Sequence, residues 1–329
     1  MAFWSGRRVL VTGAGGFIGS HVVEDLVDAG ASVRALVHYN ARADHAMLAD
    51  LAPEKRASVE VVLGDVTDAH QMMEVVDGVD TVFHLAALIA IPYSYHAPAS
   101  YVATNVSGTL NLLEGARRAR VRSFIQTSTS EVYGSAQYVP IDEKHPLQAQ
   151  SPYAATKIAS DQLALSFHRA FEMPVLVVRP FNAFGPRQSA RAVIPTILTQ
   201  LLADRPVRLG SLDTRRDFTL AADTARGFRM AAESNVVGTV VNLGTGKDYS
   251  ILEVAETAAR MLGKPLNLES DPNRIRPSKS EVDRLLANPA QAKALFGWEY
   301  TTSLDEGLRL TAEWLERNAA RYDPTRYTI

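Results

Sequence analysis

The sequence predicts an α/β protein in which a doubly wound parallel sheet is joined to a smaller C-terminal α/β domain. Between residue 7 and about residue 180, short apolar runs alternate with segments of helical periodicity, as they do in successive βαβ units. Beyond Arg179, proline and arginine become frequent and the connecting segments lengthen, which indicates a second domain. We therefore expect one domain over residues 1–179, rejoined by about 218–246, and a smaller one over residues 180–329.

The expected strands of the first domain are apolar runs without polar alternation, which is typical of strands buried on both faces. They lie at residues 9–11, 33–37, 59–63, 81–85, 123–127 and 175–178. The helical segments between them lie at residues 20–28, 46–51, 69–76, 101–118 and 153–171. In the second domain we expect helices at residues 192–203, 223–232, 251–262 and 304–319, and a strand at residues 239–243 that returns to the first sheet.

The composition excludes several classes of protein. The 329 residues are 47% hydrophobic and can bury a sizeable core. Lys and Arg number 34 against 36 Asp and Glu, so nothing indicates a nucleic-acid or membrane partner. Without cysteine there is no disulfide, thiol catalysis or thiolate metal site, and we expect no metal. The chain reaches strand sequence too early for a signal peptide, and its most apolar run, residues 85–91, is too short to cross a bilayer, so we expect a cytoplasmic protein.

A glycine-rich loop follows the first expected strand, in R-V-L-V-T-G-A-G-G-F-I-G-S, residues 8–20. Gly13, Gly16 and Gly19 stand three residues apart and precede a helical segment. Glycine allows a tight turn and the close approach of a pyrophosphate, and the free N–H groups at a helix N-terminus attract the anion. We therefore expect a Rossmann dinucleotide-binding loop that includes Phe17 and Ile18.

The end of the second expected strand bears on the choice between NAD and NADP. An acidic residue at this place commonly binds the ribose 2′-hydroxyl of NAD. This chain instead reads Val-His-Tyr-Asn at residues 37–40, so that His38 and Arg42 can pair with a 2′-phosphate and no carboxylate repels it. We therefore expect NADP rather than NAD. The further cofactor contacts expected after the third and fourth strands are Asp65, Val66, Leu85, Ala86 and Ala87.

A tyrosine and a lysine provide the expected chemistry, in S-P-Y-A-A-T-K, residues 151–157. Ser151 can cap a helix that has proline in its first turn, and Tyr153 and Lys157 then share one helix face. An ammonium near a phenol favours the phenolate and lowers the tyrosine pKa from about 10 towards neutrality. A phenolate beside a nicotinamide can take the proton of a hydroxyl while hydride leaves the same carbon.

These motifs resemble the extended short-chain dehydrogenase/reductase family of nucleotide-sugar enzymes. The resemblance extends over nearly the whole chain, through T-G-A-G-G-F-I-G, H-L-A-A, N-V-S-G-T-L-N-L-L-E, Y-A-A-T-K, R-P-F-N-A-F-G-P-R and R-R-D-F. It implies a homodimer built from the helices near residues 101–118 and 153–171, a hydroxyl at Thr129 that works with the tyrosine, and a cofactor contact at Asn105. It also implies that the substrate is bound by Asn182, Arg187, Arg216 and Arg276.

Glu131 favours one reaction within this family. The 4,6-dehydratases of the family carry glutamate there, because the C5 proton becomes acidic after oxidation at C4 and needs a base. The dTDP-glucose type has aspartate before the glutamate, whereas this chain has Ser130, which is more similar to the GDP-mannose type. Glu131 then serves as base and acid in turn. The reaction returns the hydride to C6, is redox-neutral, and implies a tightly bound cofactor.

Two further stretches resemble dehydratases that act on nucleotide-linked N-acetylglucosamine, at residues 135–147 and 185–197. The expected function is therefore 4,6-dehydration of a nucleotide hexose, with UDP- or GDP-N-acetylglucosamine as substrate. The alternatives are a UDP-glucuronate decarboxylase, which also resembles T-S-E-V-Y-G, and a 4-epimerase, which Glu131 disfavours. A non-catalytic NAD(P)-binding sensor is a further alternative, but such proteins often lack the tyrosine–lysine pair.

Overall fold

A seven-stranded parallel sheet forms the larger part of the structure, a computed structural model that describes residues 3–42, 44–275 and 277–325. The strand order is β10-β6-β5-β4-β1-β2-β3. The strands are β1 (Arg8–Thr12), β2 (Ser32–His38), β3 (Glu60–Gly64), β4 (Thr81–His84), β5 (Ser123–Thr127), β6 (Val175–Pro180) and β10 (Val240–Leu243). The predicted α/β fold class is confirmed, and the segment expected to return to this sheet does so by pairing with β6.

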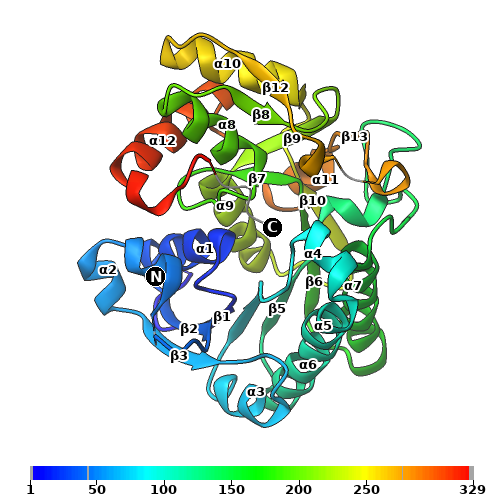
Figure 1. The fold of residues 1–329 in the computed structure, drawn as a ribbon. Helices are drawn as coiled ribbons and strands as arrows, with labels where there is room; N and C mark the ends of the chain where they lie inside the picture. Colours follow the sequence, from blue (N-terminus) through cyan, green and yellow to red (C-terminus); the bar gives the residue numbers. More distant parts are fainter. Residues whose placement is uncertain (1–2, 43, 276, 326–329) are drawn as a thin grey trace.

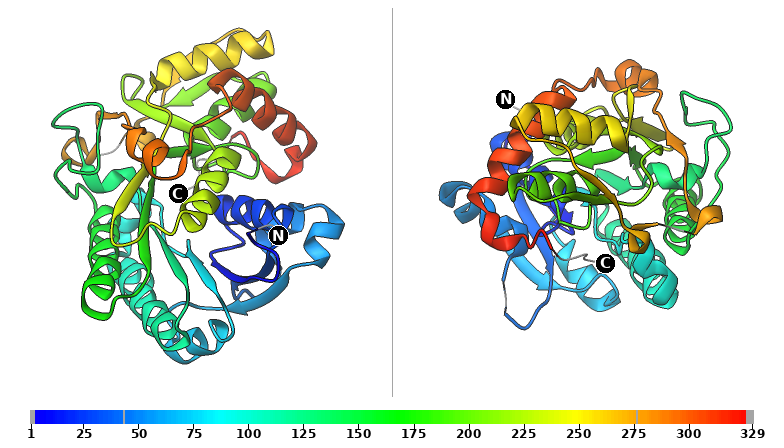
Figure 2. Two further views of the ribbon diagram at one scale, coloured as in Figure 1. Left: turned by 180° about the vertical axis from the view of Figure 1, so that it is seen from behind. Right: turned by 45° about the horizontal axis from the view of Figure 1, so that its top comes forward.

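Helices cover both faces of the sheet, as Figures 1 and 2 show. Because side chains alternate along a strand, Val9 and Val11 of β1 pack on one face against α1 and α9, and Leu10 packs on the other against α3 and α6. α7 covers this second face beside α6. These helices are α1 (Phe17–Asp28), α9 (Ala221–Glu233), α3 (Ala69–Val75), α6 (Gly108–Ala119) and α7 (Pro152–Phe171). The smaller helices are α2 (Pro53–Ala57), α4 (Ile91–His96), α5 (Pro98–Tyr101) and α11 (Ala290–Phe296).

Two of the expected helices differ in the structure. The segment at residues 46–51 is a 3₁₀ helix (Ala46–Asp50). The single helix expected over residues 101–118 is replaced by α5, a π-helical turn (Val102–Ser107) and α6. Such π-turns are common at functional sites, and this one brings Thr104 to the cavity described below.

Two smaller sheets lie beyond the carboxyl ends of the parallel strands (Figure 1). The first has the order β11-β9-β13, with β7 also paired to β9, and the second contains β8 and β12. Their strands are β7 (Asn182–Phe184), β8 (Val207–Leu209), β9 (Arg215–Leu220), β11 (Asp248–Ser250), β12 (Leu268–Ser270) and β13 (Arg284–Leu285). Three helices share an apolar core with them: α8 (Val193–Leu202), α10 (Ile251–Leu262) and α12 (Leu304–Arg317). In the described part of the chain, no helix has the length and apolarity that a membrane span needs.

Candidate active site

A cavity of about 1150 Å³ lies between the parallel sheet and the smaller sheets. Its floor is formed by the residues that follow the parallel strands, and its opposite wall by the β7 region, β9 and residues 273–275, 277 and 281. In open α/β sheets, ligands bind at the carboxyl ends of the strands. The cavity slightly exceeds the usual size of a small-molecule site, so it suits a large ligand or more than one ligand.

The glycine-rich loop forms one end of the cavity, and all five residues predicted for it line the cavity: Gly13, Gly16, Phe17, Ile18 and Gly19. Gly13 has φ +66°, and a Cβ there would lie 2.7 Å from the backbone nitrogen of Ala86. Gly16 is the N-cap of α1 and has no side chain to accept from the first N–H groups of the helix, which have no intrahelical acceptor either. This arrangement fits a dinucleotide pyrophosphate. Gly15 also lines the cavity but was not among the predicted residues.

The region beyond β2 differs from the prediction. His38 lines the cavity, but its Nδ1 lies 3.8 Å from the carboxylate Oδ2 of Asp65. Arg42 is exposed and lies outside the lining, and its backbone N–H donates to Asn40. The predicted absence of a carboxylate was wrong because β2 pairs with β3: His38 stands opposite Gly64, and Asp65 is the next residue. Val66 lines the cavity beside it, as predicted.

The residues after β4 form the floor at the other end. Leu85, Ala86 and Ala87 line the cavity as predicted. Asn105 does not. Its buried amide accepts from the backbone N–H of Leu88 at 2.8 Å, and donates to the carbonyl of Leu88 and to the hydroxyl of Thr156, both at 3.0 Å. Asn105 therefore supports the wall of the cavity instead of facing a cofactor.

The predicted catalytic residues meet at the centre of the cavity. The Ser151 hydroxyl accepts from the backbone N–H of Ala154, and α7 begins at Pro152, so that Tyr153 and Lys157 lie one turn apart on one face. Both line the cavity together with Thr129 and Glu131, which follow β5. Thr129 lies close enough to Tyr153 to influence the ionisation of the phenol. Ser130 differs from the prediction, because it is buried and lies outside the lining.

The protonation of Tyr153 also differs from the prediction. Burial raises the pKa of Tyr153, the Thr129 hydroxyl lowers it, and the nearby charge of Glu131 raises it. Lys157 donates to the carbonyl oxygen of Thr127 at 2.6 Å, and burial lowers its pKa to about 8. The expected pKa of Tyr153 near neutrality is therefore wrong for this arrangement, because the desolvation of the phenol outweighs the effects that favour the phenolate.

The opposite wall offers hydrogen-bond acceptors. Asn182 lines the cavity as predicted, and Gln188, which was not predicted, lies beside it. The Gln188 amide donates to the carbonyl of Ala183 at 2.9 Å, which fixes its orientation. The side-chain oxygens of both residues are buried and have no hydrogen-bond partner among the described residues. Buried polar atoms are normally satisfied, so these two oxygens suit ligand groups that donate hydrogen bonds.

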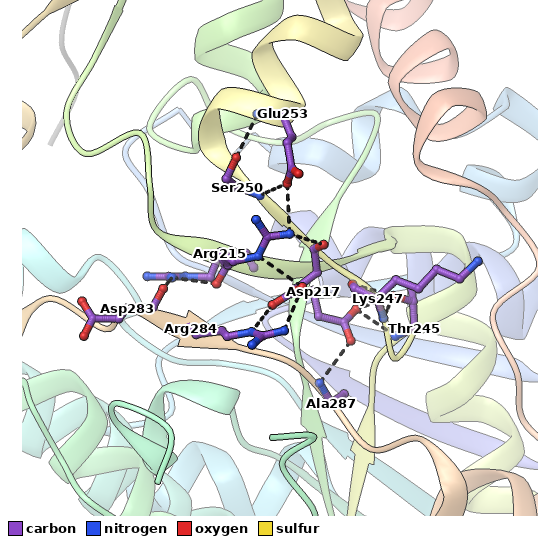
Figure 3. A network of polar contacts seen from close by, with 11 residues as sticks. Arg215, Asp217, Thr245, Lys247, Ser250, Glu253, Asp283, Arg284 and Ala287 are labelled. Atoms are coloured by element: carbon purple, nitrogen blue, oxygen red, sulfur yellow. Dashed lines mark hydrogen bonds and ion pairs between the residues drawn. The ribbon is translucent and has the colours of Figure 1, made fainter. Parts of the chain in front are cut away.

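Arg216 of β9 lines the cavity as predicted, and its guanidinium lies 3.3 Å from Glu281. The neighbouring residues Arg215 and Asp217 belong to a network of polar contacts shown in Figure 3. There Arg215 pairs with Glu253 at 3.0 Å, and the buried Asp217 carboxylate accepts from four donors on Thr245, Gly246 and Ala287. This network fixes β9 and thereby the position of Arg216.

Arg187 does not reach the cavity. Its guanidinium is buried against α1, where it donates to the Ser20 hydroxyl at 3.2 Å and pairs with Glu24. Arg276 lies outside the described residues. Two arginines that were not singled out, Arg191 and Arg274, line the cavity instead. Arg191 belongs to the G-P-R-Q-S-A-R stretch, so only its place in the fold distinguishes it from Arg187.

A Rossmann sheet that carries this glycine loop and this tyrosine–lysine helix defines the extended class of short-chain dehydrogenases/reductases, which act on nucleotide sugars. Within that class, the family model for GDP-mannose 4,6 dehydratase matches residues 10–311, and the chain belongs to this family of NAD-dependent nucleotide-sugar 4,6-dehydratases. It is 32% identical over 325 residues to dTDP-glucose 4,6-dehydratase of Streptomyces niveus, covering 96% of this chain and 95% of the relative.

Solved structures agree with this assignment. The dTDP-glucose 4,6-dehydratase of Streptomyces venezuelae, whose structure contains NAD, superposes with a TM-score of 0.85 at 30% identity, covering 97% of this chain and all of that chain. The UDP-glucuronic acid 4-epimerase of Bacillus cereus, in complex with UDP-glucuronic acid and NAD, superposes with a TM-score of 0.85 at 27% identity, covering 94% and 99%. The fold is thus shared by dehydratases and epimerases, and the side chains at the centre of the cavity must distinguish the reactions.

Proposed function

We propose that this 4,6-dehydratase acts on UDP- or GDP-N-acetylglucosamine and that Glu131 is its base at C5. The main support is that Glu131 lines the same cavity as Tyr153. The negative charge of Glu131 also raises the pKa of the Tyr153 phenol, so the two side chains lie close together. Two other described acids line the cavity, but Asp65 lies beside His38 and Glu281 is paired with Arg216. Glu131 is therefore the carboxylate to which we assign the C5 proton.

The side chains divide the proton transfers among them. A bound dinucleotide supplies the acceptor for the C4 hydride and the donor that returns it to C6. Tyr153 is a neutral phenol in the resting site and must act as the phenolate: the Lys157 ammonium favours that form, and the phenolate takes the proton of the sugar 4-hydroxyl. Glu131 takes the C5 proton. Because Ser130 lies outside the lining, Glu131 is also the group that protonates the departing C6 hydroxyl. When hydride returns to C6, C5 regains a proton from solvent and Tyr153 releases the proton that it took.

We propose NAD as the cofactor, contrary to the preference for NADP expected from the sequence. Both solved structures compared above contain NAD. The carboxylate of Asp65 beside His38 repels a 2′-phosphate and can accept a hydrogen bond from a 2′-hydroxyl. Calorimetric titration of cofactor-depleted protein should show that NAD binds at least as tightly as NADP. Tighter binding of NADP contradicts this proposal.

The opposite wall supports the choice of substrate. Arg191, Arg216 and Arg274 line the cavity where a diphosphate can be held by charge-assisted hydrogen bonds. The segment at residues 88–92 is apolar and packs around Tyr153, with Ile89 exposed on the cavity. This surface suits the methyl group of an acetamido substituent, whereas the oxygens of Asn182 and Gln188 suit its N–H and the sugar hydroxyls.

The test uses a panel of UDP-, GDP-, dTDP- and CDP-sugars, with products identified by mass. We expect loss of one water from a nucleotide N-acetylglucosamine. The Glu131→Gln variant should still reduce its bound cofactor, visible near 340 nm, but should form little product and exchange the C5 hydrogen slowly in deuterated solvent. A normal rate of dehydration in this variant contradicts the role of Glu131, and release of carbon dioxide from UDP-glucuronate by the wild type favours a decarboxylase.

We also propose a homodimer, in which α6, α7 and the adjoining π-turn of each subunit form the interface. Large apolar side chains are exposed there: Val102 at 51%, Leu110 at 39% and Phe171 at 51%. Light scattering after gel filtration should give twice the chain mass, and Leu110→Glu should shift the population to monomers. A monomeric wild-type protein contradicts this proposal.

We further propose the domain division given above, at about residue 180.

A further inference from the structure

A fully buried carboxylate lies one helical turn beyond the catalytic lysine. Asp161 of α7 has no exposed surface, and its Oδ2 accepts three hydrogen bonds: from the Ser128 hydroxyl at 2.6 Å, and from Nε and Nη2 of Arg179 at 3.2 and 3.0 Å. Its Oδ1 is also buried and has no hydrogen-bond partner among the described residues. A proton on Oδ1 therefore has no acceptor, whereas a negative charge on Oδ2 has three donors.

Arg179 requires this carboxylate to be charged. The Arg179 side chain is 2% exposed and remains protonated, since a guanidinium does not lose its proton in proteins. Its remaining nitrogen, Nη1, donates to the neutral hydroxyl of Tyr133 at 3.0 Å. Burial raises the pKa of Asp161, whereas the charge of Arg179, the hydrogen bond from Ser128 and the charge of Lys157 lower it. A buried guanidinium without a counter-charge is strongly destabilising, so the pair is an ion pair.

Lys157 depends on the same carboxylate. Its ammonium group donates to the neutral carbonyl of Thr127. From β4 it faces His84, whose pKa burial lowers to about 3, so that this histidine is neutral. The positive Arg179 of β6 binds the same Asp161 carboxylate, and Tyr153 on the helix of Lys157 is a neutral phenol. Burial disfavours the ammonium form, and the charge of Asp161 is the effect that favours it.

We propose that Asp161 is a positioning residue: a single buried carboxylate that serves two cations, Arg179 and Lys157, and thereby keeps the lysine positively charged beside Tyr153. This inference rests on the proposed roles of Tyr153 and Lys157. Asp161 also acts on Tyr153 directly, because its negative charge disfavours the phenolate. The effect through Lys157 favours the phenolate, whereas the direct effect of Asp161 disfavours it. A variant without the Asp161 charge therefore shows which effect is larger.

The experiment compares the pH dependence of kcat/KM in the NAD-loaded enzyme and three variants. In Asp161→Asn, the alkaline limb, where Lys157 loses its proton, should shift by about one pH unit or more towards acid. In Arg179→Gln, Lys157 no longer competes with a second cation for the Asp161 carboxylate. The alkaline limb of the kcat/KM profile should therefore shift towards higher pH. Ser128→Ala is the matched control: it removes a hydrogen bond to Asp161 but no charge, and its limb should stay in place.

A second measurement does not depend on catalysis. The chain has seven lysines, so ε-carbon-labelled lysine gives few NMR signals, and Lys157→Arg identifies the one that belongs to Lys157. This signal should titrate near pH 8 in the wild type and at lower pH in Asp161→Asn. If this shift is present but activity does not follow it, the roles proposed for the tyrosine and lysine are at fault.

An unchanged Lys157 titration in Asp161→Asn overturns the proposal. So does a higher activity of that variant at every pH, because the direct effect on Tyr153 then dominates. If Asp161→Asn does not fold, Arg179→Gln decides the question, and an unshifted Lys157 titration in that variant overturns the proposal as well.

Discussion

Arg187 is expected to join the two halves of the structure instead of binding phosphate. Its guanidinium pairs with Glu24 of α1 and bonds to Ser20 of the same helix. Next to this pair, the neutral ring of His21 donates to the carbonyl of Pro186 at 3.0 Å. The change that tests this is Glu24→Gln, which removes one charge of the pair and alters nothing on the cavity.

The expected loss of stability follows from the exposure of the two partners. Breaking a fully buried ion pair costs about 3 to 5 kcal/mol. Here the Arg187 side chain is 9% exposed but that of Glu24 is 26% exposed, and Glu24 is shared with Lys55. We therefore expect the free energy of unfolding to fall by about 2 kcal/mol. For a chain of 329 residues, this corresponds to a decrease of about 3 °C in Tm.

The assay combines thermal unfolding with titration of a nucleoside diphosphate. Glu24→Gln, Arg187→Met and the double variant should lose similar stability, with a coupling energy of about 2 kcal/mol, and should bind the diphosphate normally. Arg191→Met, on the cavity, is the matched control and should do the opposite: weaker binding with an unchanged Tm. Refutation would come from independent effects of the two single variants together with weak diphosphate binding by Arg187→Met.

Three further predictions concern the catalytic tyrosine, the glycine loop and the buried histidines. Tyr153→Phe should lower kcat about 10²- to 10⁴-fold and leave the affinity for NAD unchanged, as measured by steady-state kinetics and calorimetry. Gly19→Ala places a Cβ 2.1 Å from the carbonyl oxygen of Gly13, and should weaken NAD binding by about tenfold or more in the same titration. Burial lowers the pKa of His21 to about 4 and that of His84 to about 3, so the unfolded chain binds more protons below pH 6.5. As the pH falls from 6.5 towards these two pKa values, each histidine should lower the free energy of unfolding, measured in urea, by about 1.4 kcal/mol per pH unit. In His84→Gln, the part of this decrease that is due to His84 should be absent.

The strands of the larger sheet could be predicted because most of their residues are buried and each contains a short apolar run. β1 and β5, for example, lie where the apolar runs place them, within a residue at each end. The short strands of the smaller sheets carry no such signal: β13 has two residues, and all three residues of β12 are exposed. The π-turn before α6 was also missed, because its sequence has ordinary helical periodicity.

The parts of the site that could be predicted are those fixed by local spacing. The glycine loop and the Tyr153–Lys157 pair each occupy a short continuous segment of the chain, and the structure brings all of their predicted residues to the cavity. The misplaced residues depend on neighbours distant in sequence. Asp65 reaches His38 only through the register of two strands, and Arg187 is drawn to α1 by a glutamate more than 160 residues away. Asp161 did leave a signal, since it continues the four-residue spacing of Tyr153 and Lys157 along α7.

These long-range contacts matter for a reaction in which hydride is removed from one carbon of a sugar and returned to another. The hydride leaves C4 and returns to C6, so the sugar and the dinucleotide must keep their relative position until both transfers are complete. The dinucleotide loop leads into α1, and the segment that carries Gln188 and Arg191 begins at Arg187, which is fixed to that same helix by Glu24. The wall that we propose to face the sugar is thus attached directly to the helix that we propose to receive the pyrophosphate. Loosening this attachment should therefore impair the return of hydride to C6 more than its removal from C4, because the second transfer relies on a geometry maintained throughout the first.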